Sequence, residues 1–183
     1  MGALVEWDWS WLHTLTGDGK VMPGLISGLF SSRPDERISS HGDLYCEVVN
    51  QGSLYSAAAG VVDVILTELE RRGDLPAEAW YLLDAIFRGE SHGRTVLIDG
   101  SRVEVSDYCR SKIARALPLI EDAATGAVGE EFQGIAFLLG GMAEFYPAVS
   151  EILEREVVAS TGERKIIAEN GLSEALELIE GSS

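Results

Sequence analysis

The chain contains 183 residues, of which 46% are hydrophobic and 24% are charged, so it has enough apolar material for one globular core. Thirty acidic residues against fourteen basic ones give a formal charge of −16. Such a surface repels nucleic-acid phosphates and anionic membranes, and it attracts basic partners. The charge therefore argues against a nucleic acid or a membrane as the partner.

The acidity is spread evenly along the chain. Residues 1–91 carry six bases and fourteen acids, and residues 92–183 carry eight bases and sixteen acids, so each half has a net charge of −8. The charge is thus a property of the whole body and not of a tail. Two explanations remain open: the charge recruits a basic partner, or it only keeps the protein soluble.

Three features indicate a cytoplasmic protein. Residues 1–11 have no basic cluster and no long apolar run, which argues against a signal peptide. The longest uncharged and mostly apolar stretch, residues 132–143, is too short to cross a bilayer. Cys46 and Cys109 lie in helical apolar patterns, so we expect two buried free thiols, a state typical of a reducing compartment.

In the first half of the chain, apolar residues at helical spacing predict four helices, over residues 21–30, 34–49, 55–72 and 76–88. Pro23, Pro34 and Pro76 fall in the first turn of three of them, where a missing backbone N–H needs no partner. Gly73 follows the third helix and is expected at its C′ position, where a left-handed conformation is common.

The second of these helices is expected to point its apolar stripe inward and its polar face outward. The inward set is Ile38, His41, Leu44, Tyr45 and Val48, and the outward set is Glu36, Ser40, Asp43 and Glu47.

Residues 89–104 interrupt the helical pattern. The run 95–98, followed by Asp99-Gly100 and two more valines, favours a small β-hairpin near residues 95–105, with a plain loop as the alternative. Further helices are expected over residues 106–124, 130–145, 147–160, 163–170 and 173–179. Pro118 should kink or split the first of these, and Gly171 should cap the fourth. The chain is therefore predicted to be one all-α domain, residues 1–183.

Paired short helices can form a bundle or a solenoid, and a family resemblance favours the solenoid. Many bacterial HEAT-repeat proteins show a Trp, a His, a Gly-containing turn and a Pro that opens a Leu-rich helix, then a polar helix start, then a His-Gln-Gly-Thr-x-Tyr signature. The corresponding residues here are Trp11, His13, Gly17, Pro23, Leu25, Ile26 and Leu29, then Ser31, Asp35, Glu36 and Arg37, then Asn50-Gln51-Gly52-Ser53-Leu54-Tyr55. The signature departs from the family pattern conservatively, with Asn for His and Ser for Thr.

The resemblance also includes residues 61–66, 81–89 and 109–119, and it covers about residues 7–145. It implies antiparallel helix pairs stacked in a curved, right-handed array, in which the stacking of neighbours buries the core. At roughly forty to forty-seven residues per repeat, three to four pairs fit this length. Such solenoids usually present a surface to other proteins, and this branch of them is largely uncharacterised. The resemblance implies no reaction.

The residues themselves carry no recognisable catalytic pattern. His13, His41 and His92 have no ligand partners at helical spacing, so we expect no metal, and His41 is interpreted as a core residue. No phosphate-binding loop is present, and no cofactor is expected. Trp7, Trp9 and Trp11 alternate with acids, so they are interpreted as an N-terminal cap and not as a platform for nucleic-acid bases. We therefore do not expect an enzyme.

The best functional signal is an acidic surface. In a solenoid, equivalent helices of successive pairs lie side by side, so acids on the second and fourth helices would form one negative strip. The loop near residues 89–105 adds further acids, and two tyrosines are candidate hot spots. An ordinary solvated surface remains the alternative. The predicted partner-binding residues are Glu36, Asp43, Glu47, Tyr55, Glu78, Tyr81, Asp84, Glu90, Asp99 and Glu104.

Two functions remain open from the sequence. The first is an acidic immunity protein, which neutralises a basic bacterial toxin such as a nuclease effector by covering its active surface. The second is a HEAT-repeat scaffold or regulatory adaptor without a toxin partner.

Overall fold

The structure is a computed structural model that describes residues 7–181. Residues 1–6, which belong to the segment considered above for a signal peptide, and residues 182–183 lie outside the described part. The α-helices are α1 (Met22–Leu29), α2 (Pro34–Val48), α3 (Ala57–Arg72), α4 (Ala77–Arg88), α5 (Val105–Arg115), α6 (Leu117–Gly126), α7 (Gly129–Met142), α8 (Ser150–Ala159) and α9 (Gly162–Gly181). Short 3₁₀ turns cover Trp9–Trp11, Gly19–Val21 and Pro147–Val149.

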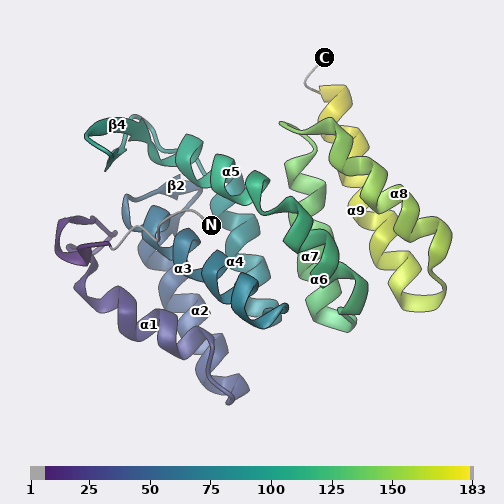
Figure 1. Ribbon diagram of the computed structural model, residues 1–183, viewed down its shortest axis with the longest axis horizontal. Coiled ribbons are helices and arrows are strands. Elements are labelled where there is room, and N and C mark those ends of the chain that lie inside the picture. Colours follow the sequence, from purple (N-terminus) through teal and green to yellow (C-terminus); the bar gives the residue numbers. More distant parts are fainter. Residues whose placement is uncertain (1–6, 182–183) are drawn as a thin grey trace.

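The helices are arranged in two rows. One row consists of α2, α4, α7 and α9, each in contact with the next, and the other begins with α1, α3 and α5 in the same manner. Helix α1 packs against α2 at the N-terminal end of the rows, and α8 packs against α9 at the C-terminal end. Figure 1 shows this progression from the purple N-terminal helices to the yellow C-terminal ones. The described residues share one hydrophobic core, which includes the fully buried Trp80, Phe87 and Phe132.

The predictions for the first four helices are confirmed to within one or two residues, and the chain is mostly helical as expected. Gly73 follows α3 with φ +80°, which is the left-handed cap that the sequence predicts. Pro118 also acts as expected, because α5 ends at Arg115 and α6 begins at Leu117. Within residues 7–181, no helix combines the length and the apolar character needed to cross a bilayer.

Two small antiparallel hairpins accompany the helices. The predicted one is present as β3 (Thr95–Ile98) and β4 (Ser101–Glu104), and its turn residues Asp99 and Gly100 have φ of 49° and 79°. A second hairpin, β1 (Val49–Asn50) with β2 (Ser53–Leu54), was not predicted. Its strands of two residues are too short to show the alternation that identifies a strand.

The C-terminal prediction of two helices separated by Gly171 is wrong. α9 is one continuous helix of 20 residues, and Gly171 lies in its middle. A Cβ at Gly171 would lie 2.9 Å from the carbonyl oxygen of Ala136 in α7. The glycine therefore allows α9 to approach α7 closely and does not terminate a helix.

The predicted orientation of α2 is also partly wrong. Ile38, expected to point inward, is 63% exposed, whereas Ser40, expected to point outward, is 8% exposed. The reason lies in α1, where Gly28 has no side chain and Ser40 fills the space that a Cβ would occupy. Helix α2 is thus turned toward α1, so Cys46 is exposed rather than buried, while Cys109 is buried as expected.

The N-terminal tryptophans act as a cap in part. Trp7 donates a hydrogen bond from Nε1 to Oδ2 of the buried Asp63 in α3, over 2.9 Å. The ring of Trp9 lies against Gly60 of the same helix, where a side chain would collide with it. Trp11, by contrast, is 80% exposed.

Candidate partner-binding groove

A groove of about 400 Å³ lies between α2 and α4 and contains two of the predicted partner-binding residues, Tyr81 and Asp84. Arg37 of α2 pairs with Glu78 of α4 over 3.2 Å at one end, and Val49 and Gly89 line the other end, so the two helices run in the same direction. We call this site the α2–α4 groove, and it is lined by His41, Tyr45, Val49, Gly52, Tyr81, Asp84, Ala85, Arg88 and Gly89.

Arg88 connects this groove to α7 and α9. Its Nε donates to Oδ1 of Asp84 over 2.6 Å, and its two terminal nitrogens donate to Oε1 of Glu174 over 2.7 Å and to the carbonyl oxygen of Phe137 over 2.9 Å. One guanidinium thus serves two carboxylates. Oδ2 of Asp84 has no hydrogen-bond partner within residues 7–181, although the side chain is only 18% exposed.

The environment of Asp84 disfavours its charge. Burial raises the pKa of Asp84, and the nearby Glu174 raises it further, while Arg88 acts in the opposite direction without cancelling the shift. The attraction to Arg88 therefore does not fully offset the loss of hydration that the Asp84 carboxylate undergoes in the groove.

His41 lies in the same groove, and it is not the satisfied core histidine that the sequence predicted. Its Nε2 is almost inaccessible to water and has no hydrogen-bond partner within the described chain. Burial lowers the pKa of His41, so the imidazole is neutral at pH 7. Its ring lies 6.3 Å from that of the half-exposed Tyr45. No group of three possible metal-ligating side chains occurs within residues 7–181.

Tyr81 forms the wall of the groove toward α7. Its ring centroid lies 6.2 Å from that of Phe137, and its hydroxyl donates to the carbonyl oxygen of Glu130 over 3.4 Å. Burial raises the pKa of Tyr81, with Glu130 and Glu78 adding to the effect. The tyrosine is therefore a neutral ring, partly open to a partner.

The structure does not bring the α2 acids to this groove. Glu36 accepts a hydrogen bond from Ser31 over 2.6 Å, and Glu47 accepts from the backbone and hydroxyl of Thr16 over 3.1 and 2.8 Å. Both lie on the side of α2 that faces α1 and the N-terminal segment. Asp43 is exposed and has no partner in the described chain. The acids of α2 therefore lie on a different side of α2 from the one that faces α4, and they do not form one strip with the acids of α4.

The remaining predicted residues, Tyr55, Glu90, Asp99 and Glu104, lie in or near the two hairpins. Glu90 pairs with Arg110 over 2.6 Å, and Glu104 accepts from the buried Ser91 over 2.6 Å. The guanidinium of Arg94 lies 4.6 Å from the centre of the Tyr55 ring. Asp99 occupies the tip of the β3–β4 hairpin, which projects from one edge of the molecule (Figure 1).

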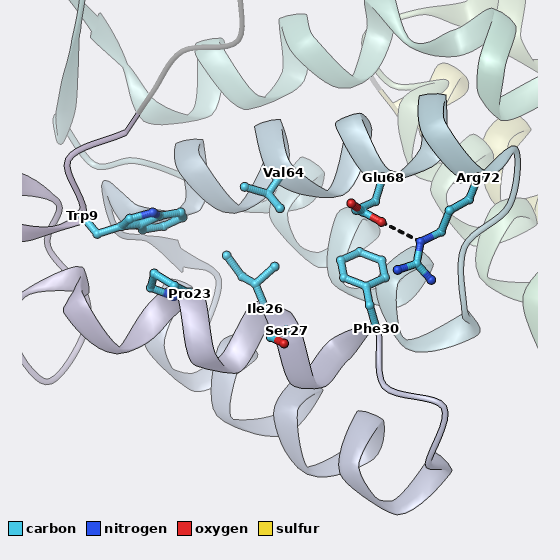
Figure 2. A pocket seen from close by; sticks show the side chains of 8 residues that line it. All are labelled: Trp9, Pro23, Ile26, Ser27, Phe30, Val64, Glu68 and Arg72. Atoms are coloured by element: carbon cyan, nitrogen blue, oxygen red, sulfur yellow. Dashed lines mark hydrogen bonds and ion pairs between the residues drawn. The ribbon is translucent and has the colours of Figure 1, made fainter.

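A second groove of similar size, about 430 Å³, lies between α1 and α3. Figure 2 shows its apolar lining of Trp9, Pro23, Ile26, Phe30 and Val64, with Glu68 and Arg72 at one end. We call it the α1–α3 groove. Arg72 lies 4.8 Å from the Phe30 ring and donates from Nε to Glu68 over 2.6 Å. No pattern in the sequence indicates this site.

Three residues of the α2–α4 groove were missed as functional candidates: His41, Tyr45 and Arg88. The spacing of Asp84 and Arg88, four residues apart on a helix, is a signal for that ion pair. No such signal exists for Glu174, which is 86 residues away from Arg88.

Comparison of the chain with protein-family models, with curated proteins and with solved structures gives no significant match. The site must therefore be interpreted from its own geometry.

Proposed function

We propose that the chain is a short HEAT-like α-solenoid that binds a basic bacterial toxin and acts as its immunity protein in the cytoplasm, without catalysing a reaction. The succession of contacts along α2, α4, α7 and α9, and along α1, α3 and α5, supports the solenoid, because stacked repeats contact only their neighbours. The α2–α4 groove supports the binding role, because it combines aromatic rings with uncompensated negative charge.

The observation that carries this proposal is how the charges pair. Within the described residues, every Lys and Arg except Arg94, Arg102 and Arg115 has an ion-pair partner in the same chain. Only those three arginines are left within the described residues to neutralise the surplus of acids that gives −16. A partner with a basic surface would supply those cations and would be attracted from a distance.

A scaffold or adaptor is the second candidate, and the predicted acids themselves favour it. Glu47, Glu78, Glu90 and Glu104 all engage groups of their own chain. Acids that stabilise the fold contribute less to recognition, and the remaining charge would then serve solubility.

The test is co-expression with the product of the neighbouring open reading frame. An immunity protein should relieve growth inhibition by that product and form a complex with it on a sizing column. The association rate should fall steeply between about 20 and 200 mM salt, because charges that steer encounter are screened. Absence of both rescue and complex would overturn the immunity role, and a complex insensitive to salt would favour the adaptor.

The same complex tests the site. Tyr81→Ala and Asp84→Asn should each weaken binding by about tenfold or more, as expected at the centre of an interface. Glu154→Gln is the matched control, because Glu154 is an exposed acid on α8 outside the groove. Equal effects of all three variants would show that only the overall charge matters.

A further inference from the structure

We infer that the α2–α4 groove binds the guanidinium of an arginine that the partner presents. This inference rests on the proposed protein-binding function and specifies the chemistry that the groove selects.

The groove has more acceptors than donors. Arg88 gives each of its acceptors one contact, which leaves Oδ2 of Asp84 without a partner within residues 7–181. Nε2 of His41, which lines the same groove, also has no partner within the described chain. A carboxylate offers only acceptors, so the missing element is a group rich in N–H donors.

The charge of the groove points the same way. Asp84 and Glu174 share one cation, Arg88, and the charge of Glu78 is already matched by Arg37. A second cation would balance the remaining carboxylate, and the partly buried position of Asp84 weakens the screening of that attraction by water. The guest is therefore cationic.

The walls of the groove select a planar cation. Tyr45 of α2 is 39% exposed, and Tyr81 of α4 stands on the opposite side of the groove. Tyrosine rings attract a cation over their faces, and guanidinium stacks on rings in a manner that an ammonium group cannot. A guanidinium also offers five N–H donors in a planar fork, which matches a carboxylate oxygen together with a nearby acceptor.

Tyr45 is a wall residue with room to adjust to the guest, because its side chain is 39% exposed. Nε2 of His41 is covered, and Tyr45 lies beside the imidazole with its ring tilted by 36°. A change of rotamer at this half-exposed tyrosine would place the phenol ring over the entering guanidinium.

The experiment is an NMR titration of the isolated protein with Nα-acetyl-arginine amide, followed through the amide signals of the whole chain. We expect saturable shifts confined to residues 41–52 and 81–89. The citrulline analogue, which has the same shape without the charge, should bind about tenfold more weakly or not at all, as expected when a charged hydrogen-bonding partner is lost. The lysine analogue should also bind more weakly.

Matched variants locate the site. Asp84→Asn and Tyr45→Ala should each weaken arginine binding by about tenfold, whereas Glu154→Gln should change it by less than about twofold, because its effect is long-range and screened. Urea unfolding confirms that each variant is folded, and Tyr45→Ala is safe in this respect because its side chain is half exposed.

Three outcomes overturn the inference: shifts spread over acids throughout the chain, equal binding of arginine and citrulline, or equal binding of arginine and lysine. Failure of the proposed function can be distinguished from failure of this inference. If arginine binds in the groove but no toxin binds the protein, the inference stands and the immunity role fails. If a toxin binds and the Tyr45 and Asp84 variants bind it normally, the function stands and the inference fails.

Discussion

The two grooves lie between equivalent neighbours of the two helix rows, yet their charges are balanced in opposite ways. In the α1–α3 groove, one carboxylate, Glu68, receives two arginines, Arg71 and Arg72, both at 2.6 Å. In the α2–α4 groove, one arginine, Arg88, serves two carboxylates. The hydrogen bond from Arg71 lowers the pKa of Glu68, with Arg72 contributing, whereas burial raises the pKa of Asp84. The carboxylate of the first groove is thus fully paired with arginines of its own chain, whereas Asp84 in the second groove shares its arginine with Glu174.

Packing and recognition in this molecule thus use the same residue types, carboxylates and arginines, in different ratios. The α1–α3 groove is lined mostly by apolar side chains, and at its charged end Glu68 and Arg72 pair with each other (Figure 2). In the α2–α4 groove, Oδ2 of Asp84 and Nε2 of His41 have no partner within the described residues, and two tyrosines lie beside them. An incomplete set of hydrogen bonds in a folded protein has a cost, and binding of a partner is a reason for a site to retain that cost.

Replacing each arginine by methionine tests this contrast most strongly. Arg88→Met leaves Asp84 and Glu174 facing each other without a cation, so we expect a loss of about 2 to 3 kcal/mol, below the value for a fully buried pair because the site is partly exposed. Arg72→Met leaves Glu68 paired with Arg71, so its cost should be about 1 kcal/mol or less. Urea unfolding at pH 7 measures both.

The cost of Arg88→Met should also depend on pH. Burial and Glu174 already raise the pKa of Asp84 in the folded state, and loss of Arg88 raises it further. The folded variant therefore takes up a proton that the unfolded chain does not, so the stability lost at pH 7 should be partly recovered as the pH falls toward 4. Equal losses for the two arginine variants at every pH would remove the distinction between the grooves.

The turn that ends the α2–α4 groove provides the next largest effect. Gly52 has φ +76° in the β1–β2 hairpin and lines the groove. A β-branched side chain is strained at positive φ, so Gly52→Val should destabilise the fold by about 2 kcal/mol. Gly42→Ala is the control, because Gly42 lies in α2 with open space around it and alanine favours a helix. A Gly52 variant as stable as wild type would contradict the left-handed turn.

His41 offers an opposite effect, a gain of stability. His41→Leu removes the unpartnered Nε2, and we expect a gain of about 1 kcal/mol at pH 7, discounted because the residue is only half buried. Arginine binding in the groove should weaken at the same time, which is the usual exchange of function for stability. Combined urea unfolding and NMR titration measure the two effects on one sample.

The pH dependence of this variant has a defined sign. Burial lowers the pKa of His41 below its usual value of 6.5, so the unfolded chain binds a proton more readily than the folded protein does. The wild-type protein is therefore free of this protonation penalty above pH 6.5, and it loses stability as the pH falls from 6.5 through the folded pKa of His41. His41→Leu should lack this loss, so its advantage should grow from pH 7 to pH 5. A constant difference between the two proteins would refute the assignment.

Local signals in the sequence predicted most of the fold but little of the site. Pro23, Pro34 and Gly73 mark helix ends because their backbone constraints act within one turn, and Asp99-Gly100 marks the hairpin for the same reason. The role of Gly171 depends on Ala136 in another helix, and a glycine looks the same in sequence whether it ends a helix or lets two helices meet.

The site was predicted only where one helix determined it. Tyr81 and Asp84 fall in the groove because both follow the spacing of α4. Tyr45 was assigned to the core, and the α2 acids to a shared strip, because the sequence does not show that α2 turns toward Gly28 of α1. The pairing of Arg88 with Glu174 is set by the stacking of α4, α7 and α9, which no local pattern encodes.

The smallest predicted effect, at Ile38, tests whether α2 is turned toward Gly28 of α1. This orientation decides which residues reach the α2–α4 groove. Ile38 is 63% exposed, so Ile38→Lys should change the free energy of unfolding by less than about 0.5 kcal/mol. Ser40→Leu, two residues away, should cost about 2 kcal/mol, because Ser40 packs directly against Gly28 and leaves no room for a larger side chain. Urea unfolding of the two variants gives the comparison. A large loss at Ile38 and none at Ser40 would restore the orientation expected from the apolar stripe, and it would then direct Tyr45 into the core instead of the groove.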